Sequence, residues 1–300
     1  MRLAFIDIGS NTIKMTVFSS GPQLKEIFSK TLHARLSSYV ENGRLTESGI
    51  RRLILSVGAL RRSARRYLCK KQNVFAFATA CVRNAENRAD VLDRAERSLK
   101  MKIDLLSGER EAELCFRGAS ILAGFPSDGI LADLGGGSCE FISFENKRII
   151  KKVSLNIGAL ANYRRFVKGE YITESEAAEL SEYLKNELST LKRSLAMPKG
   201  GEIVITGGSA RALVKLVSAI ESGDSSLPFT ITKERAEEIC KKCASGELVP
   251  LTEKLLRERA KIIPCACAVF SAAADTFARD SFTVVCGGAR EGYADSLING

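Results

Sequence analysis

The sequence predicts an α/β fold of two domains, each built on a mixed sheet flanked by helices. Three hundred residues with 45% hydrophobic content can bury a core, and chains of this length commonly divide into two domains. In each half, strands come first and helices alternate with strands afterwards, which is the order expected of a mixed sheet. Each half opens on a strand that ends in an aspartate before a glycine turn. The halves therefore resemble diverged copies of one βββαβα unit.

The first half begins with a predicted meander of three strands. Residues 2–8, 12–18 and 24–33 are rich in β-branched and aromatic side chains. Thr46 can then cap a long helix. Further strands are predicted at residues 73–80 and 101–106, and further helices at residues 88–99 and 109–122.

A cluster of glycine, proline, serine and aspartate at residues 123–129 interrupts this pattern, and the order of strand, aspartate and glycines restarts at Ile130. We therefore place the domain boundary between residues 122 and 123, and the last helix could pack back on the first domain. A ligand is expected in a cleft between the two halves. Strands are predicted at residues 130–134, 139–144, 148–154, 202–206 and 282–286, and helices at residues 157–167, 173–195 and after residue 206.

The excess positive charge is confined to one region. The net charge is +10, and residues 44–102 contain 15 Lys or Arg against 5 Asp or Glu, which leaves 30 of each for the rest of the chain. Apolar residues recur there at helical spacing, with basic residues largely off that stripe. This predicts an amphipathic helix whose basic face is either a solvated surface or a polyanion-binding surface. The stripe consists of Ile50, Leu53, Ile54, Val57, Leu60 and Leu68, and the basic face of Arg51, Arg62, Arg65, Arg66 and Lys70.

Composition excludes several kinds of site. The nine cysteines lie mostly in apolar segments of a long chain, which favours buried thiols over a disulfide framework. Cys240 and Cys243 form one CxxC and Cys265 lies near Cys267, but nothing completes a four-ligand zinc site. The single His33 excludes a mechanism that needs two histidines. Without a signal peptide or an apolar run of ~20 residues, we expect a soluble, cytoplasmic protein that binds neither membranes nor specific nucleic acids.

Three glycine turns follow three predicted strands. Glycine has the largest backbone entropy cost on folding, so glycines after a strand indicate a sharp turn or a close approach to another group. Consecutive N–H groups of such a turn can form a nest for phosphate oxygens. One such turn could be an ordinary tight turn, but three in a repeated topology suggest a shared phosphate ligand. The predicted phosphate-binding residues of these turns are Gly9, Ser10, Asn11, Gly135, Gly136, Gly137, Ser138, Gly207, Gly208 and Ser209.

Two aspartates occupy equivalent points in the two halves. Asp7 and Asp133 each lie at the end of a strand before a glycine turn, where the carboxylate would face a bound phosphate. A carboxylate beside a phosphate requires a cation between the two negative groups. Mg²⁺, or Mn²⁺ in its place, suits this position because it is held by one or two carboxylates plus substrate oxygens. Asp133 with nearby Glu140 meets that requirement, and Asp7 is a further predicted metal ligand. A cross-strand salt bridge is the alternative role of Glu140.

Acidic residues also cluster where the helix at residues 109–122 begins. Glu109, Glu111 and Glu113 fall around its first turn, where acidic side chains usually interact with the helix macrodipole. A carboxylate that faces a ligand could instead act as a general base towards water. Arg83 follows a strand and could clamp a phosphate with two donors or form a surface salt bridge.

Six segments stand out in order along the chain: "DIGSNTIKM", "ATACVRNAEN", "LLSGEREAEL", "DLGGGSCEF", "ITGGSARAL" and "GGAREGY". Together they resemble the exopolyphosphatase and guanosine pentaphosphate phosphatase family, a branch of the actin, sugar kinase and Hsp70 superfamily. The resemblance covers essentially the whole chain and implies two ribonuclease H-like (actin-like ATPase) domains with mixed five-stranded sheets and an interdomain active-site cleft. It implies Mg²⁺-dependent hydrolytic release of the terminal phosphate of inorganic polyphosphate, or of the 5′ γ-phosphate of guanosine pentaphosphate, without a covalent intermediate.

The resemblance also implies roles for individual residues. Glu111 falls on the catalytic glutamate of the family, and Asp133 and Glu140 fall on its metal- and water-organising carboxylates, so Glu140 is also a predicted catalytic residue. Arg83 matches a phosphate-facing arginine. The two phosphate loops of the family fall on Ser10 with Asn11 and on Ser138 with its neighbouring glycines.

The chain departs from the family pattern at Arg110, which replaces a glutamate, and at Thr12, which replaces a serine. It resembles the short forms that lack additional C-terminal helical domains, and a homodimer is expected. The main prediction is an exopolyphosphatase that hydrolyses a phosphoanhydride bond. The alternatives are a guanosine pentaphosphate hydrolase, an ATP-dependent kinase of the same superfamily, and a catalytically weak regulator that binds polyphosphate or an alarmone.

Overall fold

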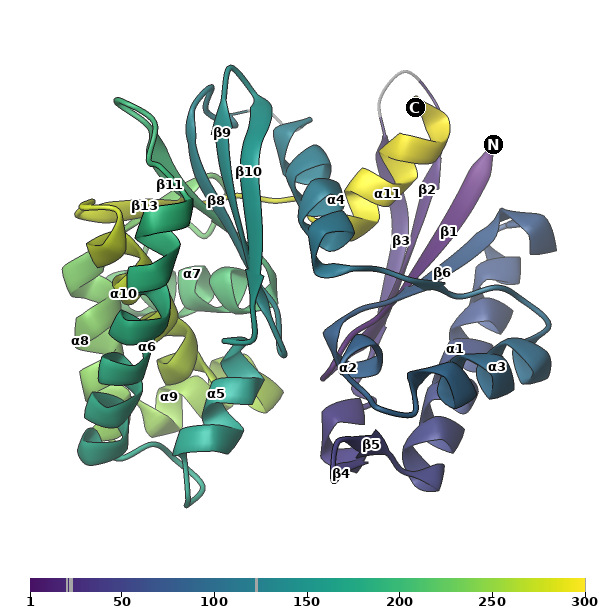
Figure 1. The fold of residues 1–300 in the computed structure, drawn as a ribbon, viewed down its shortest axis with the longest axis horizontal. Coiled ribbons are helices and arrows are strands. Elements are labelled where there is room, and N and C mark those ends of the chain that lie inside the picture. Colours follow the sequence, from purple (N-terminus) through teal and green to yellow (C-terminus); the bar gives the residue numbers. More distant parts are fainter. Residues whose placement is uncertain (20, 22–23, 122–123, 300) are drawn as a thin grey trace. The chain divides into compact units, whose positions relative to one another are not determined.

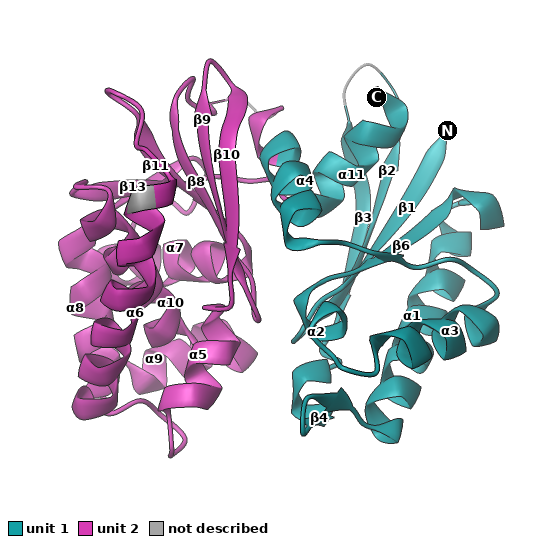
Figure 2. Ribbon diagram, viewed as in Figure 1, with its two compact units in different colours: residues 1–118, 289–300 teal, residues 119–288 magenta. Residues whose placement is uncertain are grey.

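The structure is a computed structural model that describes residues 1–19, 21, 24–121 and 124–299. The chain forms two compact units, Met1–Gly118 with Ala289–Gly300 and Ala119–Gly288 (Figure 2). The domain boundary expected between residues 122 and 123 lies outside the described residues. Both units have the α/β architecture that the sequence predicts.

The first unit contains a five-stranded mixed sheet with helices on both faces (Figure 1). Its elements are β1 (Arg2–Ile8), β2 (Ile13–Ser19), β3 (Lys25–Leu32), η1 (Leu36–Tyr39), β4 (Val40–Glu41), β5 (Arg44–Leu45), α1 (Glu47–Arg66), η2 (Lys71–Asn73), β6 (Val74–Ala78), α2 (Ala80–Arg83), α3 (Arg88–Leu99), β7 (Asp104–Leu105), α4 (Gly108–Ser120) and α11 (Ala289–Ile298). The strand order is β3-β2-β1-β6-β7. Since β1, β6 and β7 are parallel, their carboxyl ends meet at one edge of the sheet.

The central strand β1 is buried on both faces, which explains its continuous apolar run. Ala4 and Ile6 point to the face covered by α1 and α3, because side chains alternate along a strand. Phe5 points to the opposite face, where it packs with Ala294 of α11. The last helix of the chain is therefore part of the first unit.

Helix α1 is the predicted amphipathic helix. The Thr46 side chain caps it by accepting a hydrogen bond from the N–H of Gly49, at 3.3 Å. Most of the predicted apolar stripe is buried against the sheet, but the prediction for Leu68 is wrong, because the helix ends at Arg66 and Leu68 is 74% exposed with a φ of 60°. The buried members of the stripe are Ile50, Leu53, Val57 and Leu60.

The second unit contains a six-stranded sheet (Figure 1). Its elements are β8 (Gly129–Leu134), β9 (Cys139–Glu145), β10 (Arg148–Leu155), α5 (Ala159–Phe166), α6 (Glu174–Ser194), β11 (Glu202–Thr206), α7 (Gly208–Glu221), β12 (Phe229–Thr232), α8 (Lys233–Ala244), α9 (Val249–Leu256), η3 (Arg257–Arg259), α10 (Ile263–Thr276) and β13 (Ser281–Val284). The strand order β10-β9-β8-β11-β13 repeats that of the first sheet, and β12 adds an antiparallel edge strand. The prediction of five strands is therefore wrong for this sheet.

Helix α10 passes through the core of the second unit, and every residue from Ile263 to Ala274 is buried. Its cysteines and those of α8 are free thiols. Burial raises the pKa of Cys240 to about 11 and that of Cys243 to about 12. These two thiols are therefore protonated at neutral pH. Seven of the nine cysteines are buried, as expected, whereas Cys240 is partly exposed and Cys286 is exposed. No helix among the described residues is long and apolar enough to cross a membrane.

Candidate active site

The first group of predicted site residues meets at the carboxyl edge of the first sheet. Asp7 is the penultimate residue of β1, Arg83 ends the short helix that follows β6, and Glu111 lies in the first turn of the helix that follows β7. The register places Asp7 beside Phe77 and Ala78 beside Leu105. Three segments far apart in sequence thus deliver charged side chains to one edge.

Arg83 and Glu111 form an ion pair in which Arg83 Nη1 lies 2.6 Å from Glu111 Oε2. The side chains are only 17% and 12% exposed, so this is not the surface salt bridge that was the alternative for Arg83. Nη1 also donates a hydrogen bond to the carbonyl of Leu106, at 3.1 Å. The pair therefore fixes the Glu111 carboxylate at the end of the sheet.

Asp7 has a partner that the sequence reading missed. Arg290, the second residue of α11, donates from Nη1 to Asp7 Oδ2 at 3.0 Å, and both side chains are largely buried. Arg290 lies in "GGAREGY", one of the six segments that resemble the family, but the sequence analysis assigned no role to this arginine. The carboxylate of Asp7 already has a cationic partner, and its role as a metal ligand stays a prediction.

The first glycine turn is a tight hairpin between β1 and β2. The N–H of Gly9 donates to the carbonyl of Thr12 at 3.1 Å. The carbonyls of Ser10 and Asn11 accept hydrogen bonds from Ser37 and Arg35, at 3.0 and 2.8 Å. The N–H groups of Ser10 and Asn11 have no backbone acceptor within the described ranges of the chain. A nest at this turn would therefore use these two N–H groups, while that of Gly9 closes the hairpin.

The second glycine turn repeats this hairpin between β8 and β9. The N–H of Gly135 donates to the carbonyl of Ser138 at 3.0 Å, as Gly9 does to Thr12. The carbonyls of the glycines accept hydrogen bonds from the first turn of α5, including Leu160 to Gly136 at 3.0 Å. A Cβ on Gly158 would lie 2.5 Å from the Gly136 backbone, so the close approach requires glycine. Because the carbonyls bond to α5, we expect the N–H groups of Gly136 and Gly137 to face the other way.

Asp133 and Glu140 are directly opposite one another in β8 and β9. Opposite residues of an antiparallel pair project from the same face, so both carboxylates lie on one side of the sheet. Glu140 is 1% exposed, and its Oε1 accepts a hydrogen bond from Ser154 Oγ of β10 at 2.8 Å. Burial raises the pKa of Cys139 well above its usual value, and the charges of Glu140 and Asp133 raise it further.

This carboxylate pair fits Mg²⁺, which needs one or two protein carboxylates and takes its other ligands from water and phosphate oxygens. The part of the chain that the structure describes holds no group of three or more His, Cys, Asp and Glu side chains suited to a metal. A dedicated all-protein cage is therefore not present in that part of the chain. A carboxylate pair completed by substrate is the arrangement that Mg²⁺ tolerates best.

The third glycine turn lies beside Asp133. Gly207 follows β11, whose last residue Thr206 pairs with Asp133. Its φ of 108° favours glycine, and a Cβ there would lie 2.6 Å from the carbonyl oxygen of Leu134 and 3.0 Å from Asp133 Oδ1. Gly207, Gly208 and the buried Ser209 thus begin α7 directly against the end of β8.

Two arginines gather at the beginning of α7, and the sequence reading assigned a role to neither. The guanidinium of Arg259 from η3 lies against Gly208, where any Cβ would clash with it. Burial lowers the pKa of Arg259, and the like charge of Arg211 lowers it further. Helix N-termini already favour anions, so positive charge at this end increases the attraction.

Two copies of a mixed sheet, each with a glycine hairpin after its first strand, define an actin-like α/β fold. The chain belongs to the Ppx/GppA phosphatase family, whose model matches residues 16–299. The crystal structure of the Aquifex aeolicus Ppx/GppA family member superimposes with a TM-score of 0.81 at 25% identity, covering 99% of this chain and 97% of that one. These findings confirm the family and the fold class that the sequence predicts.

The chain is also similar to two curated proteins. Exopolyphosphatase 1 of Mycobacterium tuberculosis is 30% identical over 229 residues, which cover 74% of this chain and 65% of the relative. A guanosine-5'-triphosphate,3'-diphosphate pyrophosphatase of Vibrio atlanticus is 26% identical over 304 residues, which cover 99% of this chain and 59% of the relative. The chain thus spans less than two thirds of the length of each relative.

Proposed function

We propose that the protein releases the terminal phosphate of inorganic polyphosphate by hydrolysis, with Glu111 as the general base. The observation that carries the proposal is the largely buried Arg83–Glu111 ion pair of 2.6 Å at the end of three parallel strands. Membership of a phosphatase family and similarity to an exopolyphosphatase support it.

In the proposed reaction, Glu111 accepts a proton from the water that attacks the terminal phosphorus. A P–O bond to the water oxygen forms while the anhydride P–O bond breaks, and orthophosphate and a chain shorter by one phosphate are released. A guanidinium carries five N–H donors, so Arg83 can hold Glu111 and a phosphate oxygen together. Arg83 thus positions the base and contacts the substrate.

The other groups bind phosphate or organise charge. We assign phosphate contacts to the N–H groups of the first two glycine turns and to the beginning of α7, where Arg259 adds a positive charge. Mg²⁺ or Mn²⁺ would be held by Asp133 and Glu140 and, when bound, would neutralise charge on the transferred phosphate. To bind the same cation, Asp7 would have to give up its ion pair with Arg290. That all these groups act on one substrate stays a prediction, as do a homodimer and a cytoplasmic location.

Guanosine pentaphosphate is the second candidate substrate. The observation that favours it is the pyrophosphatase of Vibrio atlanticus, which matches 99% of this chain. The alternative of a weak regulator rested on Arg110, but Arg110 Nη1 lies 2.9 Å from the Glu113 carboxylate at an exposed position. Glu113 therefore balances the charge that Arg110 introduces beside Glu111.

Orthophosphate release by the purified protein tests the proposal. We expect release from long-chain polyphosphate, and release from guanosine pentaphosphate at a different specificity constant kcat/KM. Comparison of the two values identifies the preferred substrate. Release from neither substrate, with Mg²⁺ or Mn²⁺ present, would contradict the proposed function.

A further inference from the structure

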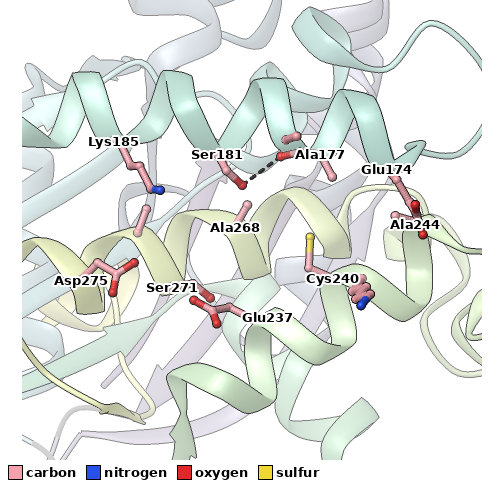
Figure 3. Close-up of a pocket in the computed structure, with 13 residues that line it drawn as sticks. Glu174, Ala177, Ser181, Lys185, Glu237, Cys240, Ala244, Ala268, Ser271 and Asp275 are labelled. Atoms are coloured by element: carbon pink, nitrogen blue, oxygen red, sulfur yellow. Dashed lines mark hydrogen bonds between the residues drawn. The ribbon is translucent and has the colours of Figure 1, made fainter.

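A groove between α6, α8 and α10 of the second unit lies outside every group assigned above (Figure 3). Its cavity of about 400 Å³ is within the range of small-molecule pockets. Lysines as well as carboxylates line its walls, and the hydroxyl of Ser271 is buried. These described residues do not select one class of ligand over another, so the groove is left without an assigned ligand.

Helices α4 and α11 of the first unit lie side by side and are in direct contact (Figure 1). A Cβ on Gly292 of α11 would lie 1.8 Å from the carbonyl oxygen of Leu114 and 2.9 Å from the backbone nitrogen of Gly118. Because any larger residue would clash with the backbone of α4, this approach requires glycine. Leu114 is about one helical turn after Glu111, so the contact supports the part of α4 next to the proposed base.

One turn further along α11, an ion pair joins the same two helices. Arg117 Nε of α4 donates to Asp295 Oδ2, and Arg117 Nη2 donates to the carbonyl oxygen of Asp295 at 3.3 Å. Asp295 is 8% exposed, and its Oδ1 accepts a hydrogen bond from Asn299 Nδ2 at 2.8 Å. Two donors of one guanidinium fix direction as well as distance. The pair therefore sets the register of α4 along α11.

Helix α11 also supports the partner of the proposed base. Tyr293 packs against a buried apolar cluster that contains Leu106, and its hydroxyl donates to Asp104 of β7. The carbonyl of Leu106 accepts a hydrogen bond from Arg83 Nη1, at 3.1 Å. The same helix thus supports the segment that holds Arg83 and the helix that carries Glu111.

The beginning of α4 has little support from its own neighbours in the sequence. The preceding strand β7 has only two residues and lies at the edge of the sheet. Within the first turn, Ser107 Oγ accepts a hydrogen bond from the N–H of Arg110 at 3.1 Å, but this bond does not fix the direction of the helix. The direction of α4, and with it the position of Glu111, therefore depends on packing against α11.

We propose that Asp295 is a positioning residue for the general base. Through Arg117 it keeps α4 in register with α11, so that the Glu111 carboxylate stays where it can accept a proton from water. This role rests on the proposed function, because it requires that Glu111 is the base. Misplacing a reacting group by about 1 Å can cost ~10²-fold in rate. A contact that does not touch the substrate can therefore control kcat.

The test measures phosphate release from long-chain polyphosphate by variants of the full chain. Asp295→Asn keeps the shape of the side chain but removes its charge, so it should lower kcat roughly 10- to 100-fold and leave KM nearly unchanged. Arg117→Gln breaks the same pair from its more exposed side and should give the same loss. The matched control is Asp93→Asn, which breaks an exposed ion pair with Arg97 on α3 and should keep the wild-type rate.

A double variant separates positioning of the base from a general structural role. Once Glu111→Gln has removed the base, its position no longer matters, so adding Asp295→Asn should lower the residual kcat little further. Equal losses in the wild-type and Glu111→Gln backgrounds would overturn the proposal. A wild-type kcat in Asp295→Asn would overturn it too.

Amide hydrogen exchange tests the contact between the helices without catalysis. Residues 108–114 should exchange faster in Asp295→Asn than in the wild type, because a helix held by fewer contacts opens more often, and Asp93→Asn should not change them. If the wild type releases no phosphate, the proposed function fails, while this comparison still decides whether Asp295 holds α4. Unchanged exchange at residues 108–114 in Asp295→Asn would contradict the proposal.

Discussion

At the scale of single residues, three acidic side chains of the proposed site are held by partners in their own unit. Arg83 holds Glu111 at 2.6 Å, and Arg290 holds Asp7 at 3.0 Å. Glu140 receives a hydrogen bond from Ser154, at 2.8 Å. Groups held in place in this way need little reorganisation during the reaction, which is the main source of electrostatic catalysis.

Glu111→Gln should lower kcat for phosphate release by roughly 10²–10⁴-fold, because the amide keeps the shape of the side chain but cannot accept the proton. KM should change little, since the phosphate-binding groups remain. Glu109→Gln is the matched control, because Glu109 is an exposed acidic residue in the first turn of the same helix. A Glu111→Gln protein with more than half of the wild-type rate would remove Glu111 from the mechanism.

Asp133→Asn should raise the Mg²⁺ concentration that gives half-maximal activity by at least about tenfold, since even changes to groups behind the ligands cost 10–100-fold. Glu145→Gln, at the exposed end of β9, controls for loss of one negative charge and should leave the Mg²⁺ titration unchanged. Activity against Mg²⁺ concentration is the measurement. Full wild-type activity in excess chelator would contradict a metal site at Asp133.

At the scale of secondary-structure elements, side chains accept hydrogen bonds from the backbone N–H groups at the beginning of helix α6. Helix α6 begins with a capping box, in which the Thr173 side chain accepts a hydrogen bond from the N–H of Glu176 and Glu176 accepts one from the N–H of Thr173. Glu176 also accepts a hydrogen bond from the N–H of Lys168, at 3.0 Å. The hydrogen bonds from Thr173 and Lys168 lower the pKa of Glu176 from its usual 4.5.

Glu176→Gln should therefore lower the melting temperature at neutral pH. The folded chain has the lower pKa, so the unfolded chain binds more protons in the acid range, and the stability that Glu176 contributes is lost as the pH falls through its folded-state pKa. The difference between variant and wild type should shrink below pH 4.5, the usual pKa of the group.

Two variants control this prediction. Thr173→Ala should cost about 1 kcal/mol, the usual value of a helix cap, and Glu179→Gln, at an exposed position of α6, should have little effect. Thermal unfolding of the wild type and the three variants between pH 3 and pH 7 makes the comparison. A Glu176→Gln deficit that stays constant in acid would show that the carboxylate charge does not matter.

The basic face of α1 gives a second prediction at this scale. Four residues of the predicted face are exposed: Arg62, Arg65 and Arg66 lie on α1, and Lys70 follows the end of this helix. If they hold the part of a long polyphosphate outside the site, changing all four to Gln should raise KM for long chains. Each lost contact should also reduce the slope of log affinity against log salt by roughly 0.7–0.9. Short substrates should be unaffected, because screening over ~8 Å confines the effect to phosphates on the helix.

Measurement of KM for long-chain polyphosphate and for tripolyphosphate at two salt concentrations tests this prediction. The control removes the same charge from exposed positions of the second unit, with Gln at Lys192, Lys199, Lys215 and Lys254. Equal losses for long and short substrates, or equal losses in the control, would mean that the face acts only through overall charge or stability.

At the scale of the whole molecule, the chain is a diverged repeat. The strand order of the first sheet recurs in the second. In each unit an equivalent backbone hydrogen bond closes the hairpin after the first strand, from the N–H of Gly9 to the carbonyl of Thr12 at 3.1 Å and from the N–H of Gly135 to the carbonyl of Ser138 at 3.0 Å. The copies have specialised, because the first carries the Arg83–Glu111 pair and the second carries the opposed Asp133 and Glu140.

Local signals predicted much of this architecture. Strands β1 and β11 and helix α3 have the predicted bounds, because apolar periodicity and flanking turns define them locally. Strand β12 was missed because it has only four residues, of which Ile231 alone is buried. Such a short, exposed edge strand leaves no clear pattern in the sequence.

Contacts between distant segments could not be read from the sequence. Asp7 and Arg290 are 283 residues apart, so no spacing rule relates them, although each lies in a segment that resembles the family. Arg259 packs on Gly208 from a short turn of helix without a motif of its own. Sequence patterns thus located the strand ends, the carboxylates and Arg83, while the contacts of Arg259 and Arg290 depended on tertiary packing.

The central claim is that water, activated by Glu111, attacks the terminal phosphate of polyphosphate. The most direct test is phosphate release in water enriched in heavy oxygen, followed by mass spectrometry of the orthophosphate, with wild type and Glu111→Gln in parallel. The account predicts one solvent oxygen in each orthophosphate that the wild type releases, and almost no labelled product from the variant. Phosphate that passes to another acceptor without solvent oxygen, or labelled release at equal rates by both proteins, would contradict it.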